Sequence, residues 1–248
     1  MERELHSYSL SRVGAEAAED ARVWHIYKKR ATERSENRMK KLKATIDSLP
    51  VFAGLFSAVS TAFIIEGYKS LQPDYTEYMS KAFFAIHSQN AAPSLDKSFN
   101  PDAFEAPQLA RWWNGLWLAS LILSLFVALN AIVAQQWLEE FTSRITAPAE
   151  SHRHWARRHR AFSTGLDKWK IDFFISSLPL LLHVSLLLFS TGLVLFFWQL
   201  DKIVAGVLMA LAALATAFYL TTTIAPLKWP EAPTATPLLR FIRYAWSS

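Results

Sequence analysis

The amino-acid sequence predicts an all-α integral membrane protein, a bundle of four membrane-spanning helices. Charged residues are absent from four windows, at 48–65, 112–138, 173–200 and 203–227, which contain 18, 27, 28 and 25 residues. About 20 apolar residues in a helix cross a hydrocarbon core of roughly 30 Å. Basic residues alternate between the connecting segments, and tryptophans stand at both ends of the second window. Four such windows in 248 residues leave too little polar surface for a soluble protein.

The windows divide the chain into three parts. We expect a cytoplasmic N-terminal helical segment at 1–47, a four-span domain at 48–227 and a cytoplasmic C-terminal tail at 228–248. The individual spans are predicted at about 48–68, 112–137, 173–199 and 203–225. The segment between the first two spans is expected to contain a short surface helix within 74–88, followed by an irregular, proline-containing stretch.

The orientation follows from the distribution of Lys and Arg. The N-terminal segment, the loop between the second and third spans and the C-terminal segment carry 21 of these residues, and the two opposite connections carry 5. The side rich in basic residues is cytoplasmic by the positive-inside rule. We therefore expect a multi-pass protein with both termini in the cytoplasm. The net charge of +5 suits an anionic membrane leaflet, and we expect no nucleic-acid partner.

Residues 14–45 are rich in Ala, Glu, Lys and Arg and predict a helix before the first span. Met39, Leu42 and Ile46 form a narrow apolar stripe that leads toward the membrane. One interpretation is a cytoplasmic helix that lies against the middle loop or a neighbouring subunit. The alternative is a partner-binding coiled coil, but few heptads support it.

Small residues recur at four-residue spacing in the first and fourth spans. They predict faces where helix backbones approach closely, within the bundle or between copies in a homo-oligomer. In the first span the alternative is a pore-lining polar face that ends at Glu66. The candidate packing residues are Gly54, Ala58, Ala62, Gly206 and Ala210.

The middle loop predicts an amphipathic helix that lies in the membrane surface. Its apolar residues Trp155, Phe162, Leu166 and Trp169 recur at helical spacing, and basic residues stand elsewhere around the cylinder. We expect the apolar face to contact acyl chains and the basic residues to contact anionic headgroups. The candidate lipid-interface residues are Trp155, Arg157, Arg158 and Trp169.

Polar groups at or near the spans are the candidates for an intramembrane site, and they are His183, Glu66 and Asn130. An ionisable residue inside a span is a functional candidate by default. We expect His183 to be neutral and to face another helix or a central cavity. It then either forms a structural hydrogen bond or lines a conduction path.

The sequence contains no cysteine, so disulfides and thiolate chemistry are excluded. All seven glycines are isolated, and the His-Glu-x-x-His and Gly-x-Ser-x-Gly patterns are missing. Three histidines in the middle loop stand among four arginines, which disfavours a metal ion. We predict no catalytic residue, cofactor or metal ligand, and nothing in the sequence argues for enzymatic activity.

Six short motifs stand at the borders of the predicted spans and in the connecting segments. They are Val51-Phe52-Ala53-Gly54-Leu55-Phe56-Ser57-Ala58-Val59, Leu71-Gln72-Pro73-Asp74-Tyr75, Gln136-Trp137-Leu138, Gly165-Leu166-Asp167-Lys168-Trp169, Leu178-Pro179-Leu180-Leu181-Leu182-His183 through Gly192, and Thr236-Pro237-Leu238. Together they resemble a fungal domain family of unknown function, common in mushroom-forming basidiomycetes. The resemblance covers about residues 20–240 and implies a multi-span membrane domain with no established activity. Gln135 departs from the family pattern, in which a Lys often precedes the Gln-Trp-Leu element.

The sequence leaves three functional hypotheses. The first is an oligomeric channel or pore, which rests on the small-residue faces and the intramembrane histidine. The second is a membrane-anchored interaction or scaffold protein that acts through its cytoplasmic helices. The third is a lipid-handling enzyme. A water-filled path favours the first, and a dry bundle with exposed cytoplasmic helices favours the second.

Overall fold

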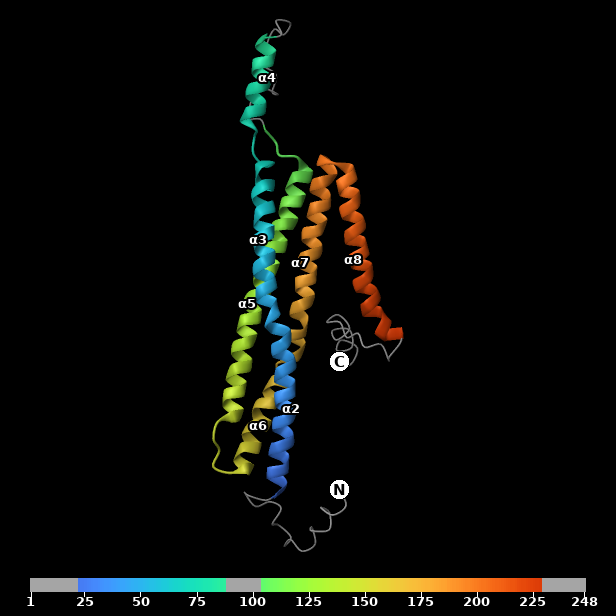
Figure 1. The fold of residues 1–248 in the computed structure, drawn as a ribbon. Coiled ribbons are helices and arrows are strands. Elements are labelled where there is room, and N and C mark those ends of the chain that lie inside the picture. The colour runs from blue at the N-terminus through green and yellow to red at the C-terminus, as the bar shows by residue number, and fades with distance from the viewer. Residues whose placement is uncertain (1–21, 88–103, 229–248) are drawn as a thin grey trace. The chain divides into compact units, whose positions relative to one another are not determined.

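The computed structural model describes residues 22–87 and 104–228, and within them it is all-helical (Figure 1). The all-α prediction is confirmed for these residues, and so is the short helix between the first two spans. The expectations for residues 1–21, 88–103 and 229–248 lie outside the described residues. The helices are α2 (Arg22–Ile46), α3 (Ser48–Lys69), α4 (Tyr75–His87), α5 (Gln108–Thr146), α6 (His152–Lys168), α7 (Ile171–Leu200) and α8 (Lys202–Lys228).

Four helical stretches in the described part of the chain have the length and composition of membrane spans. They are 22–69, which joins α2 to α3, then 108–146, 171–200 and 202–222. Between α2 and α3 only Asp47 intervenes, and its N–H still donates to the carbonyl of Lys43 at 2.9 Å. The division into an N-terminal segment, a spanning domain and a tail remains a prediction.

The buried residues of α5 follow a strict heptad pattern from one end of the helix to the other. Spacings of three and four alternate, which gives a repeat of about 3.5 residues, the pattern of a coiled-coil seam. The residues are Ala110, Trp113, Trp117, Ser120, Ser124, Val127, Ala131, Ala134, Leu138, Phe141 and Ile145.

The same alternation runs through α2 and α3 without a break at Asp47, and it recurs in α7. These helices therefore bury one narrow stripe each and leave the rest of their surface outside. The stripe of α2 and α3 is Ser35, Met39, Leu42, Ile46, Leu49, Ala53, Phe56 and Ser60, and that of α7 is Ile175, Leu178, Leu182, Ser185 and Phe189.

The chain forms two compact units, and α3, α5 and α7 contribute to both. The described residues of the first unit, here called the basic unit, are 22–50 and 129–179. Those of the second, the apolar unit, are 51–87, 104–128 and 180–228.

The apolar unit has an aromatic core centred on Trp117, which is fully buried among Phe56, Trp113 and Phe189. Two glycines of the neighbouring helices lie against this indole. A Cβ atom on Gly192 would lie 2.5 Å from Trp117 Nε1, and one on Gly67 would lie 2.7 Å from Trp117 Cζ3. The indole therefore fits only because both helices present glycine to it.

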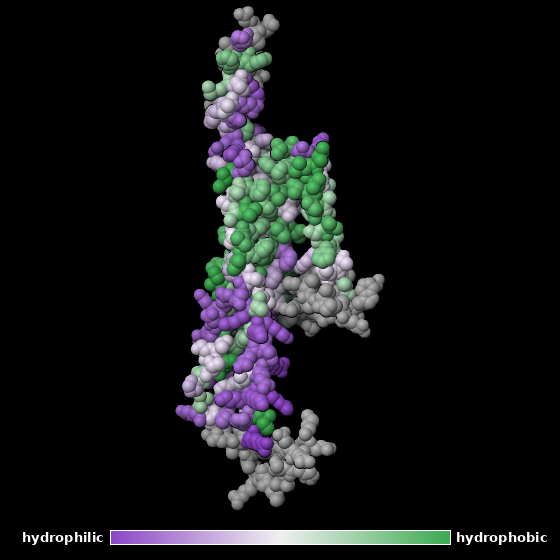
Figure 2. Space-filling view, viewed as in Figure 1, coloured by the Kyte–Doolittle hydropathy of each residue, from purple (hydrophilic) through white to green (hydrophobic). Residues whose placement is uncertain are grey.

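Serines line the remaining contacts inside the apolar unit. Ser185 Oγ donates to the carbonyl of Ser120 at 2.7 Å, which links α7 to α5. Ser57 and Ser124 place their hydroxyls 3.4 Å apart, which links α3 to α5. Small residues and hydroxyl groups of this kind are typical of helix contacts inside membranes. On the face shown in Figure 2, the surface of the unit along α7 and α8 is mainly apolar, whereas α4 also carries hydrophilic residues.

The basic unit packs α2 on α6 with an aliphatic and aromatic core. Its buried residues include Ile46, Leu138, Ile175 and Leu178, all fully enclosed. Its exposed face is hydrophilic along α2 and α6 (Figure 2). Along α2 and α6 the apolar side chains are buried and most charged side chains are exposed, which is typical of helices that face water.

Candidate functional site

An open groove of about 1170 Å³ lies in the basic unit, where α2 packs beside α6. One wall is a face of α2, and the other is formed by α6 and the beginning of α7. The lining residues are Val23, Ile26, Tyr27, Arg30, Ala31, Glu33, Arg34, Ser35, Asn37, Arg38, Lys41, His159, Ser163, Asp167 and Asp172.

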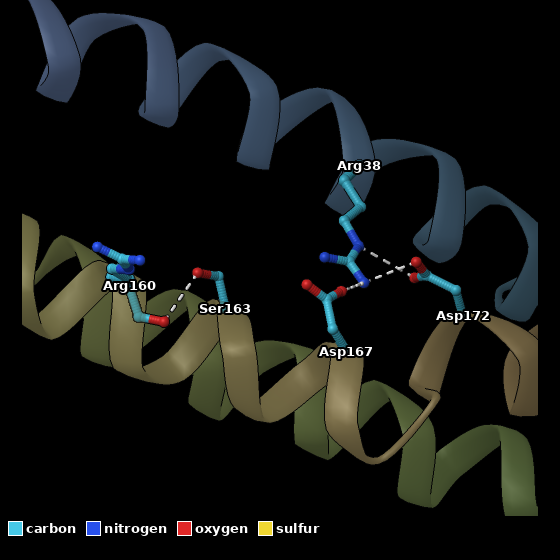
Figure 3. A network of polar contacts seen from close by, with 5 residues as sticks. All are labelled: Arg38, Arg160, Ser163, Asp167 and Asp172. Atoms are coloured by element: carbon cyan, nitrogen blue, oxygen red, sulfur yellow. Dashed lines mark hydrogen bonds and ion pairs between the residues drawn. The ribbon is translucent and has the colours of Figure 1, made fainter.

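Arg38 joins the two walls by a forked ion pair (Figure 3). Its Nη2 lies 2.7 Å from Asp167 Oδ1 and 2.6 Å from Asp172 Oδ2, and its Nε donates to Asp172 Oδ1 at 3.1 Å. Burial by itself would lower the pKa of Arg38, but hydrogen bonds and charge interactions with Asp172 and Asp167 outweigh it and raise the pKa. Arg38 therefore fastens α2 to the end of α6 and the start of α7.

The turn between α6 and α7 brings the two aspartates to one guanidinium. Lys170 adopts a left-handed conformation with φ 51°, which is uncommon for a residue with a Cβ. The N–H of Trp169 donates to Gly165 O at 3.0 Å, and that of Lys170 donates to Asp167 O at 3.1 Å. Helix α6 thus ends and α7 begins within two residues, so Asp167 and Asp172 lie on either side of the turn.

Deeper in the groove, His159 of α6 is 6% exposed and meets Ser35 of α2. Its Nε2 lies 2.8 Å from Ser35 Oγ. Its ring stacks on Trp155 with centroids 4.8 Å apart, and the edge of Tyr27 packs against it at 6.4 Å. Burial lowers the pKa of His159, because the charged imidazolium would lose its hydration. The neutral ring is therefore part of the α2–α6 contact.

The charge of the groove is set by the residues that Arg38 does not engage. Arg30, Arg34 and Lys41 of α2 are exposed and form no ion pair with the described residues. Glu33 is the acidic residue of that wall. Asp167 and Asp172 share Arg38, and the four basic residues of the lining exceed its three acidic residues by one, so the groove has a small basic excess.

The structure places the candidate lipid-interface residues in different surroundings. Trp155 is 5% exposed and its Nε1 donates to the carbonyl of Ile145 at 2.8 Å, which corrects the expectation that this ring contacts acyl chains. Arg158 donates to the carbonyls of Ala147 and Pro148 and so serves to fasten the loop before α6. Arg157 is exposed, and Trp169 is 79% exposed. Lipid contact by these two remains a prediction.

The candidate packing residues lie outside the buried stripes of this chain. Gly54, Ala58 and Ala62 are exposed on α3, which packs instead through Ala53, Phe56, Ser60 and Gly67. On α8, Gly206 is half-buried and Ala210 is exposed. A Cβ atom on Gly54 or Gly206 would meet nothing within 4 Å. These residues are therefore not the close approaches within the chain, and packing between copies remains a prediction.

The three candidate intramembrane residues are not brought together as one site. His183 is half-buried and stacks on Tyr219 of α8 with ring centroids 4.7 Å apart. Glu66 is exposed near the end of α3 and pairs with Lys69 at 2.6 Å. Asn130 of α5 is half-buried and belongs to the basic unit. The stacked pair places His183 against a neighbouring helix.

Sequence reasoning missed the groove and the Arg38 fork. Arg38 stands among many other basic residues of α2, and nothing in the local pattern distinguishes it. Asp167 and Asp172 are five residues apart and would not share a partner on one straight helix. Ser35 continues the spacing of Met39 and Leu42 and so could have indicated a buried position on α2. It was missed because a search for apolar residues does not include serine.

Four helices with the length and composition of membrane spans define a multi-pass α-helical protein, and the chain also contains a unit rich in basic residues. The family of unknown function DUF6535 matches residues 24–199, well over half of the chain, so the protein belongs to this family. The match includes the tryptophan core and every groove residue except Val23, and it ends before α8. No curated protein and no solved structure matches the chain.

Proposed function

We propose that this protein is a membrane-anchored interaction protein that docks a protein partner in the groove of the basic unit. The observation that carries the proposal is the open groove of about 1170 Å³ between α2 and α6. Its walls are held by specific contacts, the Arg38 fork and the Ser35–His159 pair, so the groove is preformed. A preformed site reduces the ordering cost of binding.

The packing of the apolar unit supports an anchor more than a conduction path. Its buried stripe is occupied by tryptophan, phenylalanine and serine side chains, and the serine hydroxyls of Ser120, Ser124 and Ser185 bond to protein groups. Ser120 and Ser124 donate to carbonyls of their own helix and Ser185 donates across to α5, so these three hydroxyl hydrogens are already engaged by the protein. The proposed function gives each unit a role: the apolar unit anchors the protein in lipid, and the basic unit binds the partner.

The proposed orientation places the basic unit in the cytoplasm, because 21 of the 26 basic residues belong to that side. The chain has no cysteine, so single cysteines report accessibility without background. Lys40→Cys in α2 should be protected from a membrane-impermeant thiol reagent in sealed right-side-out vesicles, whereas Glu77→Cys in α4 should be labelled. The reverse labelling would overturn the orientation.

Partner docking is tested by site-specific photocrosslinking in cell membranes. A benzophenone amino acid at Asn37 or Ser163, which line the groove, should yield a discrete protein adduct that mass spectrometry identifies. The matched controls carry it at Glu36 or Lys40, which are exposed on α2 but do not line the groove. Equal adducts at all four positions, lipid adducts alone, or no adduct would contradict the proposal.

A second candidate, an oligomeric channel, is favoured by two observations. His183 lies in a helix of span length and meets Tyr219, while the small residues Gly54 and Ala58 of α3 are exposed and available to a second copy. Ion flux into liposomes that contain the purified protein tests it. Flux that is lost or clearly reduced in His183→Leu would support the channel. No flux would reject it.

A further inference from the structure

We propose that the groove takes an acidic amphipathic helix, whose glutamates or aspartates bind the basic residues of α2. This inference rests on the proposed docking function and names the chemistry of the partner. Five of the α2 residues that line the groove are spaced alternately by four and three, which is the pattern of a helix seam. They are Tyr27, Ala31, Arg34, Arg38 and Lys41.

The spacing favours a helix as the occupant. A stripe of this kind follows the axis of α2 from Tyr27 to Lys41, about 21 Å at 1.5 Å per residue. The opposite wall is also helical: His159, Ser163 and Asp167 recur every four residues on α6. The α6 ridge covers about 12 Å of this length at 1.5 Å per residue. Together with the longer α2 ridge it accepts a partner helix of about four turns.

The charges favour an acidic occupant. Arg34 and Lys41 lie in the stripe and Arg30 lies beside it, all exposed and without an ion pair among the described residues. The two aspartates of the opposite wall exceed the charge of Arg38 by one, and Glu33 adds a further negative charge, so the lining carries a net charge of +1 and its basic excess lies on α2. Carboxylates at matching spacing on a partner helix complement this surface.

The N-terminal end of the groove is apolar and favours an apolar residue on the partner helix. Val23, Ile26 and Tyr27 line it, and they are 51%, 36% and 39% exposed. Clustered exposed apolar side chains next to a charged row are typical of a helix-binding surface with one apolar anchor. The partner helix should therefore be acidic along most of its length and apolar at the end that meets Tyr27.

The test uses the full-length protein in nanodiscs of neutral phosphatidylcholine. The probe is a fluorescein-labelled synthetic helix of three heptads, with leucine at the a and d positions of one end and glutamate at the remaining a and d positions. A second probe replaces each glutamate by glutamine. We expect the glutamate helix to bind and the glutamine helix to bind at least about tenfold more weakly, which corresponds to about 1.4 kcal/mol.

The matched variants separate the groove from general electrostatics. Arg34→Glu with Lys41→Glu reverses two charges in the groove and should weaken binding by about tenfold or more. Lys29→Glu with Lys40→Glu makes the same charge change on exposed residues of α2 that do not line the groove, and should have little effect. Both proteins are first checked for an unchanged unfolding temperature, so that a loss of binding is not a loss of fold.

Each other result overturns the inference. Equal losses in the two double variants mean that the helix binds by net charge alone. Equal binding of the glutamine helix removes the acidic requirement. If the groove variant instead loses only its binding to phosphatidylserine vesicles, the basic row serves lipid. When the photocrosslinks at Asn37 and Ser163 still identify a protein while the acidic helix fails, the docking function stands and only the acidic-helix inference falls.

Discussion

Helix α5 contributes the same heptad stripe to both units, but the residues that occupy it differ. In the apolar unit the stripe contains Trp113, Trp117, Ser120 and Ser124. In the basic unit it contains Leu138, Phe141 and Ile145 after two alanines. One backbone geometry is therefore filled in two ways, with tryptophans and serines in one unit and mainly with aliphatic residues in the other.

The proposed function, with the apolar unit in lipid and the basic unit in water, accounts for this difference. In water, burying aliphatic side chains drives helices together, at roughly 25 cal/mol per Å² of apolar surface. In lipid the outside is as apolar as the inside, so helix association depends on close fit and on hydrogen bonds between helices. The glycine–tryptophan contacts and serine bonds of the apolar unit provide this fit. Ion pairs at the surface and an apolar core, as in the basic unit, are typical of helix bundles that are stable in water.

The largest loss of stability is expected at the close contacts of Gly67 and Gly192 with Trp117 in the apolar unit. Gly192→Ala and Gly67→Ala would each push a methyl group into Trp117 and should lower the free energy of unfolding by about 2 kcal/mol. Gly54→Ala and Gly206→Ala are the controls, because their Cβ atoms meet nothing within 4 Å. These two should be neutral or slightly stabilising, since alanine is the better helix former. Thermal unfolding followed by tryptophan fluorescence in detergent measures all four, and equal effects would show that the tryptophan fit does not matter.

A smaller loss of stability, confined to the basic unit, is expected when the ion pairs of Arg38 are removed. Arg38→Met keeps an apolar stem but leaves Asp167 and Asp172 without their shared cation, which should cost about 1 kcal/mol because both carboxylates are half or more exposed to solvent. Hydrogen exchange by mass spectrometry should be faster in α2 and unchanged in the helices of the apolar unit. Lys40→Met, at an exposed position of the same helix, is the control. Unchanged exchange in α2 would mean that the fork does not hold it.

A smaller, pH-dependent effect should again be confined to the basic unit. Burial lowers the pKa of His159 below its unfolded value of about 6.5. Between these two pKa values the unfolded chain binds a proton that the folded unit does not bind. The stability of the α2–α6 contact should therefore fall as the pH drops below about 6.5 and level off below the folded pKa.

Exchange rates in α2, corrected for the intrinsic pH dependence of exchange, measure this effect. His159→Gln should remove the pH dependence. His154→Gln changes an exposed histidine of the same helix and should retain it. A dependence that survives in His159→Gln would assign the titration to another group.

The smallest effect is expected at the turn that positions the two aspartates. Lys170 holds φ at 51°, a conformation that costs an L residue with a side chain about 1–2 kcal/mol. Lys170→Gly removes this cost but adds roughly 0.5–1 kcal/mol of backbone entropy in the unfolded chain. We expect a net stabilisation of a few tenths of a kcal/mol in chemical unfolding, with the Arg38 fork intact. Lys170→Ala, which keeps a Cβ, should show no gain, and a clear loss in Lys170→Gly would contradict the assignment.

The sequence by itself determined the helices that have the length and composition of spans. Long windows without charge have few alternatives, because a helix is the element that satisfies its own backbone hydrogen bonds in lipid. The helix before the first span and the helix in the middle loop were also predicted from local composition and spacing. These features depend on residues close together in the sequence.

Only the tertiary structure decided which face of each helix is buried. The small-residue face at Gly54 and Ala58 was a reasonable prediction for α3, but a glycine is required only where a large partner approaches, and Trp117 approaches Gly67 and Gly192. Likewise the apolar face of α6 was assigned to lipid, whereas Trp155 packs into the basic unit. The spacing of residues predicts that a helix has an apolar or small-residue face. Which helix packs on that face depends on the tertiary structure. Arg38 meets aspartates 129 and 134 positions away, and a contact at that separation leaves no local trace in the sequence.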